Sequence, residues 1–211
     1  MFRGTLRPTV IALTLLALSA APTFAAKPVG PRLQVKPGTY VGAAEACGPG
    51  TPAGTPGGVR AAWRTHKGLP DAGRSDHALV LTKSVATTDC SSAFARIRGV
   101  NGQPALTLGF DYREDSLCTG GSARFNVLTS DGVFHFVGGC GNGTPVAAGT
   151  DRRGNDWFRV EFDLADPAVA FPPVAAGVTL VSVSVFHDEQ GTSILDNINV
   201  NGKRIGKPGR R

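Results

Sequence analysis

The residue whose surroundings point most directly to chemistry is Asp196, within the apolar segment 194–200. If that segment is a regular strand, side chains alternate between its two faces, so Asp196 shares a face with Ile194 and Ile198. A carboxylate on an apolar face needs compensation, because burying it unpaired is costly. The sequence therefore predicts an arginine partner, backbone N–H donors, a bulge that turns the side chain outward, or a bound cation.

Two further acidic side chains, Asp188 and Glu189, lie in the turn that precedes this segment. Carboxylate oxygens are hard ligands of the kind that calcium prefers. Together with Asp196 they are the predicted metal ligands, and a structural calcium ion is the one cofactor that the sequence suggests. The alternative is a purely structural Asp196, bonded to the backbone or paired with an arginine.

A second candidate site lies in residues 157–163, where polar and apolar residues alternate as in a half-buried strand. The alternation places Trp157, Arg159 and Glu161 on the face opposite Phe158. An exposed tryptophan beside charged neighbours offers a stacking surface for a sugar ring, so these three side chains are the predicted ligand-binding residues. The alternative is that Trp157 packs at the rim of the domain beneath a loop.

Signatures of common enzyme classes are missing from the sequence. It has no serine-hydrolase elbow, zinc-protease helix motif, Walker loop or dinucleotide fingerprint, and its histidines are scattered singly. No catalytic residue is predicted. Asp111, Glu114 and Asp115 form an acidic cluster that a hydrolase or lyase would use, but the same cluster is typical of a solvated turn. The sequence therefore leans away from an enzyme.

The cysteines are Cys47, Cys90, Cys118 and Cys140, an even number without the close spacing of a zinc or redox motif. In a chain made for export, such cysteines favour disulfides. We predict that they pair in sequential order, Cys47 with Cys90 and the other two with each other. The reason is that the second pair flanks what looks like one hairpin.

The N-terminus has the charged, apolar and small-residue order of a secretory signal peptide. Arg3 and Arg7 precede an apolar run over residues 10–18 that is too short to span a bilayer, and small residues follow directly. We predict a signal peptide over residues 1–25 and no membrane span once it is removed. The predicted location is secreted: periplasm, cell surface or extracellular medium.

The remainder divides into an extended, proline-containing lead-in over residues 26–38, a single domain over 39–206, and a basic tail over 207–211. Basic residues gather near the C-terminus, whereas the body of the domain is close to neutral. We therefore expect no nucleic-acid partner.

Short alternating segments between glycine- and proline-rich turns run through the domain, and no sustained helical stripe interrupts them. The predicted strands are residues 59–65, 77–85, 94–100, 105–112, 123–129, 133–137, 157–163, 179–187 and 194–200. In residues 179–187, Val181, Val183 and Val185 are expected on one face, and Asp131-Gly132 signals a hairpin. The pattern predicts an all-β fold, an antiparallel β-sandwich of jelly-roll order stapled by two disulfides.

Several segments resemble those of uncharacterised secreted bacterial β-sandwich proteins. They are LGFDYR (108–113), ARFNVLTSDG (123–132), HFVGGC (135–140), WFRVEFD (157–163) and ILDNINVNG (194–202). The closing ILDNINV also resembles the last strand of galactose-binding-like jelly rolls, which include many carbohydrate-binding modules. In those modules the aspartate that matches Asp196 often helps to hold a structural calcium ion.

These features together predict an exported, non-catalytic binding module whose partner is a polysaccharide or another polymer of the cell envelope. One alternative is a structural or interaction protein of the cell surface that has no small ligand. A second alternative is a polysaccharide-active hydrolase or lyase.

Overall fold

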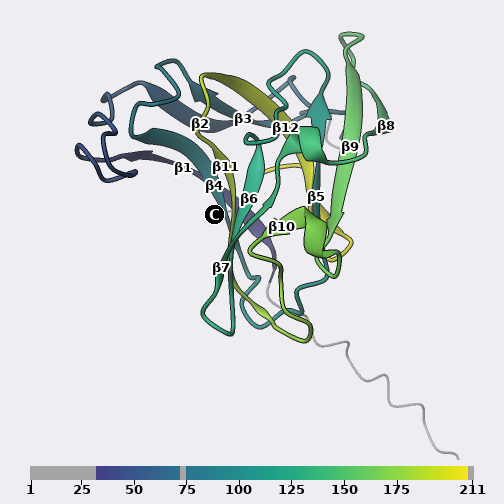
Figure 1. Ribbon diagram of the computed structural model, residues 1–211. Coiled ribbons are helices and arrows are strands. Elements are labelled where there is room, and N and C mark those ends of the chain that lie inside the picture. The colour runs from purple at the N-terminus through teal and green to yellow at the C-terminus, as the bar shows by residue number, and fades with distance from the viewer. Residues whose placement is uncertain (1–31, 72–74, 209–211) are drawn as a thin grey trace, which may run out of the picture. The chain divides into compact units, whose positions relative to one another are not determined.

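Two antiparallel β-sheets packed face to face make up the described part of the chain, which is residues 32–71 and 75–208 of a computed structural model (Figure 1). The predicted all-β sandwich is therefore confirmed. The chain passes repeatedly from one sheet to the other, as in a jelly roll. The predicted signal peptide and the last residues of the predicted tail lie outside the described residues.

The first sheet has six strands in the order β1-β4-β11-β6-β7-β10. Its strands are β1 (Gln34–Val41), β4 (Ser91–Arg98), β11 (Leu180–His187), β6 (Arg124–Thr129), β7 (Phe134–Gly138) and β10 (Ala170–Phe171). The β6–β7 hairpin forms at the predicted Asp131-Gly132 turn, where Gly132 adopts a positive φ of 81°.

The second sheet has seven strands, with the order β2-β3-β12-β5-β9-β8 and with β13 paired to β12. Its strands are β2 (Val59–Arg64), β3 (Ala78–Lys83), β12 (Gly191–Val200), β5 (Thr107–Arg113), β9 (Asp156–Asp163), β8 (Val146–Thr150) and β13 (Lys203–Ile205). Two short 3₁₀ helices, Cys140–Asn142 and Pro167–Val169, lie in connections.

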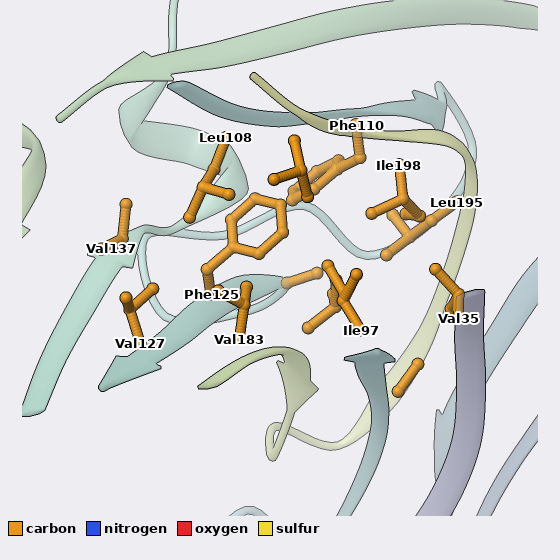
Figure 2. Packing of buried hydrophobic residues seen from close by; sticks show 14 of the residues in the cluster. Val35, Ile97, Leu108, Phe110, Phe125, Val127, Val137, Val183, Leu195 and Ile198 are labelled. Atoms are coloured by element: carbon orange, nitrogen blue, oxygen red, sulfur yellow. The ribbon is translucent and has the colours of Figure 1, made fainter. Parts of the chain in front are cut away.

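The main hydrophobic core fills the space between the two sheets (Figure 2). Phe110 and Phe162 of the seven-stranded sheet meet Phe125 of the six-stranded sheet, with ring centroids 5.6 to 6.4 Å apart. Each of these strands sends alternate side chains inward, so the residues between them point away from the core. The outer faces of the two sheets are therefore what remains available for function.

Two strands depart from the regular alternation that the sequence predicts. In β11, the pairing with β6 shifts between Leu180 and Ser182, and Val181 is consequently 40% exposed rather than sharing the core with Val183. In β12, the pairing with β5 shifts between Asp196 and Asn199. The predicted common face for Asp196 and Ile198 is therefore wrong: Ile198 enters the main core, whereas Asp196 faces the outer side with Ile194.

The start of the domain also differs from the prediction. Residues 34–38, expected in the extended lead-in, form the first part of β1, which pairs with β4 along its whole length. Pro37 is compatible with this assignment because β1 is an edge strand, where one N–H is free of the ladder. The sandwich therefore begins before residue 39.

Both disulfides form as predicted, Cys47 with Cys90 and Cys118 with Cys140. In the chain-entropy description, closing loops of these lengths contributes about 3 to 4 kcal/mol each. No helix within the described residues is long and apolar enough to cross a membrane.

Candidate functional site

The predicted sugar-stacking position of Trp157 is wrong. Its side chain is 1% exposed and packs with Leu69, Ala78 and Ile194 in a second, smaller core on the outer side of the seven-stranded sheet. Its Nε1–H donates to Asp151 at 3.3 Å. The loop that carries Leu69 covers this position, which is the packing alternative that the sequence left open.

The other two predicted ligand-binding residues are engaged within the protein. The guanidinium of Arg159 donates to both carboxylate oxygens of fully buried Asp111, at 2.7 and 2.8 Å. Glu161 accepts a bond from Asn199 at 3.0 Å. Asp111 is thus part of a buried ion pair rather than of a solvated acidic turn, and it does not supply a free carboxylate for hydrolysis.

Asp196 is 3% exposed and is compensated by backbone donors, one of the four predicted solutions. Its carboxylate accepts the N–H of Leu69 at 2.9 Å and the N–H of Asn197 at 2.6 Å. Burial raises the pKa of Asp196 to about 7, and the nearby carboxylates of Asp111 and Asp71 add to the rise against the effect of those two bonds. A small hollow of about 200 Å³ lies beside it.

The three predicted metal ligands are not brought together. Asp188 and Glu189 line a different hollow from the one beside Asp196. Across residues 32–71 and 75–208, no group of three or more His, Cys, Asp or Glu side chains is placed to hold a metal ion. Calcium binding at Asp196 itself stays a prediction.

The surface that combines exposed aromatic and polar side chains is the outer side of the six-stranded sheet, called the open face below. It consists of the side chains that β1, β4, β11, β6, β7 and β10 point away from the core. Large hydrophobic side chains on it include Tyr40 at 42% exposure, Phe136 at 44% and Phe171 at 76%. Phe94 and Phe186 stack on neighbouring strands, with ring centroids 5.6 Å apart.

Two hollows are lined in part by side chains of the open face, one beside Phe186 and the other beside its neighbour Arg124. The first, of about 540 Å³, is lined by Tyr40, Ser92 and Phe186 among others. The second, of about 620 Å³, is lined by Arg124, Phe136 and Phe171 among others. Each hollow is thus bordered by aromatic side chains of the open face.

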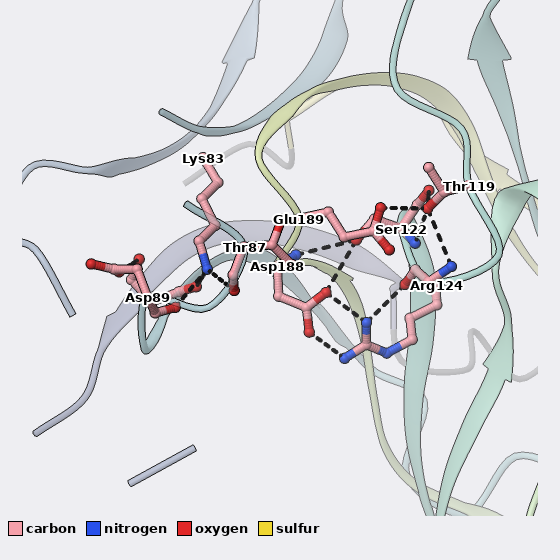
Figure 3. Close-up of polar contacts among 10 residues, drawn as sticks. Lys83, Thr87, Asp89, Thr119, Ser122, Arg124, Asp188 and Glu189 are labelled. Atoms are coloured by element: carbon pink, nitrogen blue, oxygen red, sulfur yellow. Dashed lines mark hydrogen bonds and ion pairs between the residues drawn. The ribbon is translucent and has the colours of Figure 1, made fainter. Parts of the chain in front are cut away.

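Arg124 lines the second hollow, and the acidic partner that holds it in place, Asp188, lines the first (Figure 3). Its guanidinium donates to both oxygens of Asp188, at 2.6 and 2.7 Å, and lies over the rings of Phe136 and Phe186 at 5.2 and 5.8 Å from their centroids. Burial alone would raise the pKa of Asp188, but its bonds with Arg124 and Ser122 outweigh that effect and hold the pKa below its ordinary value. This ion pair therefore persists at neutral pH.

Lys83, at the end of β3 in the seven-stranded sheet, lines the first hollow and is 1% exposed. Its ammonium donates to the backbone carbonyls of Thr87, Asp89 and Ser91, at 2.6 to 3.1 Å. Burial lowers the pKa of Lys83, with Asp89 and Asp188 opposing the shift. Because all three protons of the ammonium are used, Lys83 shapes the hollow rather than offering a free donor.

Two polar atoms on the open face lack a partner. Ser92 is 3% exposed and lines the first hollow, and its Oγ makes no hydrogen bond with any described residue. The Oδ1 of Asn126, between Ser184 and Phe136 in the sheet, is likewise buried and unbonded within the described chain. Buried polar atoms are normally bonded, so these two are candidates for bonds to a ligand.

This face was not predicted from the sequence, although part of the pattern that forms it is present there. The alternation in residues 123–129 separates Arg124 and Asn126 from Phe125 and Val127, which enter the core. It could not show that β1, β4 and β11 place Tyr40, Phe94 and Phe186 beside them, because strand neighbours are set by the topology.

Comparisons with known proteins find only distant similarity in structure. No protein-family model and no curated protein matches the chain. Among solved structures, a family 11 carbohydrate-binding module of a cellulosomal cellulase of Clostridium thermocellum is 12% identical, with 83% of this chain and 90% of that chain covered and a TM-score of 0.39. A solution structure of CtCBM11 is 14% identical, with 87% and 99% covered and a TM-score of 0.37.

Proposed function

We propose that the protein is an exported, non-catalytic module that binds a polysaccharide chain on the open face. The observation that carries this proposal is the row of exposed aromatic side chains interleaved with hydrogen-bonding groups. Phe136 and Phe171 are cross-strand neighbours, and Arg124 and Asn126 lie on the adjoining strand. Exposed apolar patches rimmed by polar groups mark binding sites.

The two kinds of side chain match the two surfaces of a sugar. The C–H groups of a pyranose ring give it an apolar face that packs on an aromatic ring, while its hydroxyls need donors and acceptors at the ring edge. Ser92 and Asn126 supply buried polar atoms that have no hydrogen-bond partner in the described part of the chain. A sugar hydroxyl can both donate and accept, so it satisfies either atom.

The extent of the face favours a chain over a single small molecule. Adjacent strands lie about 4.8 Å apart, so six strands span about 24 Å from β1 to β10. The hollows beside Phe186 and Arg124 are open rather than enclosed, which leaves room for a polymer to continue in both directions. The carboxylates of Asp188 and Glu189 are held by Arg124 and Thr119, which fits a binding role without catalysis.

The test is affinity electrophoresis of the exported protein against a panel of soluble neutral and acidic polysaccharides. We expect retention on at least one of them, and we expect Phe136→Ala combined with Phe171→Ala to weaken it tenfold or more. The matched control is Leu106→Ala combined with Val146→Ala. These two residues are 54% and 63% exposed but lie outside the open face.

The control pair should bind like the wild type, and both double variants should keep a melting temperature within a few degrees of it. A protein that no polysaccharide in the panel retains would contradict the proposal. So would equal loss of binding in both double variants.

A further inference from the structure

The strands of the six-stranded sheet carry positive charge and no negative charge. Their cationic residues are Lys36, Arg96, Arg98 and Arg124, and none of these strands contains an Asp or Glu. The seven-stranded sheet differs, because acidic residues lie on β5, β9 and β12 among its basic ones. This difference in charge lies on the outer faces of the sheets, because all four cations alternate along their strands with residues that point into the core.

Three of the four cations have no acidic partner among the residues that the structure describes. Arg124 is paired with Asp188, whereas Lys36, Arg96 and Arg98 make no ion pair with any residue in 32–71 or 75–208. Lys36 lies directly opposite Arg96 in the β1–β4 ladder, and Arg98 follows on the same face. Like charges placed opposite each other destabilise a sheet. The fold therefore keeps a repulsive cluster where a bound anion would relieve it.

The cationic cluster continues directly into the aromatic row. Arg96 lies opposite Ser184 of β11, Ser184 lies opposite Asn126 of β6, and Asn126 lies opposite Phe136 of β7. Phe94 lies two residues before Arg96 on the same face of β4 and stacks with Phe186. One ligand lying across the strands would meet stacking surfaces, unpaired polar atoms and free cations together.

We infer that the polymer bound on the open face is an acidic polysaccharide whose sugar rings carry carboxylates, that is, a polyuronate. This inference rests on the proposed function and names its substrate class. A guanidinium presents a planar fork of donors that matches a carboxylate with two parallel bonds. The cations adjoin aromatic side chains on which sugar rings would stack. We therefore assign the negative charge of the ligand to carboxylates on its sugar rings rather than to a linear phosphate backbone.

The acidic end of the first hollow does not oppose this assignment. Of the three carboxylates that line it, Asp188 is paired with Arg124, Asp89 accepts bonds from Thr55 and Ser91, and Glu189 accepts a bond from Thr119. The free cations lie on β1 and β4, from Lys36 to Arg98, away from these carboxylates along the strands. Carboxylates of the ligand are expected beside Arg96, and uncharged parts of its rings over Phe94 and Phe186.

The test compares polygalacturonate with its highly methyl-esterified form, which has the same sugar without the charge. We expect tenfold or more tighter binding to polygalacturonate in low salt, and a steep loss of that affinity as salt is raised. Arg96→Gln combined with Arg98→Gln should remove the preference. The matched control is Arg60→Gln combined with Arg64→Gln, which removes two exposed arginines from one face of β2 in the other sheet.

The remaining outcomes show whether the inference fails alone or together with the proposed function. If both forms of the polymer bind equally and Arg96→Gln with Arg98→Gln changes nothing, while the phenylalanine variants lose binding, then the polyuronate inference fails and the proposed function stands. If DNA or anionic vesicles bind as tightly with the same arginine dependence, the face is a general polyanion surface and the inference fails. If no polysaccharide binds, both fail.

Discussion

The outer faces of the two sheets differ in whether the rest of the chain covers their side chains. On both sheets, alternation points polar and aromatic side chains away from the core. On the seven-stranded sheet, Trp157, Asp111 and Asp196 are at most 3% exposed, covered or bonded by other parts of the chain. On the six-stranded sheet, Phe136 and Phe171 remain exposed.

The two faces also differ in how their charged groups are paired. The covered face, meaning the outer side of the seven-stranded sheet, pairs Asp111 with Arg159 and also gives it a bond from Asn197 at 2.8 Å. The open face leaves the charges of Lys36 and Arg96 unpaired among the described residues. Polar groups that a protein satisfies internally stabilise its fold, whereas groups that it leaves unsatisfied are available to a ligand.

The largest effect expected from this comparison is at Trp157. Trp157→Ala removes a fully buried ring from the second core and leaves Asp151 without one of its donors, so it should lower the free energy of unfolding by about 3 to 5 kcal/mol. Urea denaturation monitored by circular dichroism measures the change. Polysaccharide binding by the fraction that remains folded should be unaffected.

Phe136→Ala is the matched change on the open face. Its ring is 44% exposed, so the loss should stay below about 1 kcal/mol while binding weakens. If Trp157→Ala left stability unchanged, or if Phe136→Ala proved as destabilising as Trp157→Ala, the distinction between the two faces would collapse.

Much of the fold was predictable because it follows from local pattern. Alternation located strands such as β6 and β9 to within a residue or two, and the hairpin expected between Cys118 and Cys140 led to the correct disulfide pairing. The strands that were missed, β1, β8, β10 and β13, are short, rich in small residues or interrupted by proline. Each obtains its conformation from a neighbouring strand rather than from its own alternation.

The site was less predictable because it depends on what covers each face. Alternation correctly put Trp157 opposite the core residue Val160, but only the packing of Leu69 decides that this side is buried. The shift in β12 near Asn197, whose φ is +45°, likewise reversed the face expected for Ile198 relative to Asp196. Neither a covering loop nor a bulge is visible in a period-two pattern.

The ionisation of Asp196 is expected to make the stability of the protein depend on pH. Its pKa is about 7 in the folded protein, against an ordinary value of 3.8. Between about pH 4 and pH 7 the folded state therefore holds a proton that the unfolded state has released, so stability from this group falls as pH rises through that window. One pKa unit corresponds to about 1.4 kcal/mol, which makes the expected loss a few kcal/mol at most.

Asp196→Asn isolates this contribution, because the amide oxygen can still accept a backbone bond while the charge is gone. The pKa of His187 is lowered by burial, which makes stability rise with pH towards its ordinary value of 6.5, so the informative quantity is the difference between wild type and variant. From pH 4.5 to pH 7.5, the free energy of unfolding of Asp196→Asn should rise relative to that of the wild type. A constant difference would show that Asp196 ionises normally.

The same pair of proteins tests the calcium prediction. A cation bound at Asp196 would raise the melting temperature of the wild type on addition of calcium, most strongly above pH 7, and would leave Asp196→Asn unaffected. A wild type that does not respond to calcium would remove the metal from this site. A response that survives the substitution would place the ion elsewhere.

The smallest expected effect has the opposite sign and belongs to the open face. Arg96→Gln removes one of two like charges that lie directly opposite each other, so it should raise the free energy of unfolding by a few tenths of a kcal/mol in low salt. In about 1 M salt the Debye length falls to about 3 Å, and the gain should vanish. Arg60→Gln provides the comparison, since Arg60 lies opposite Thr82 and its substitution should change stability little at either salt concentration.

A net loss of stability in Arg96→Gln would mean that Arg96 has a stabilising partner and is not held free for a ligand. A small gain together with weaker polyuronate binding would show that this sheet gives up some stability to keep an anion site available.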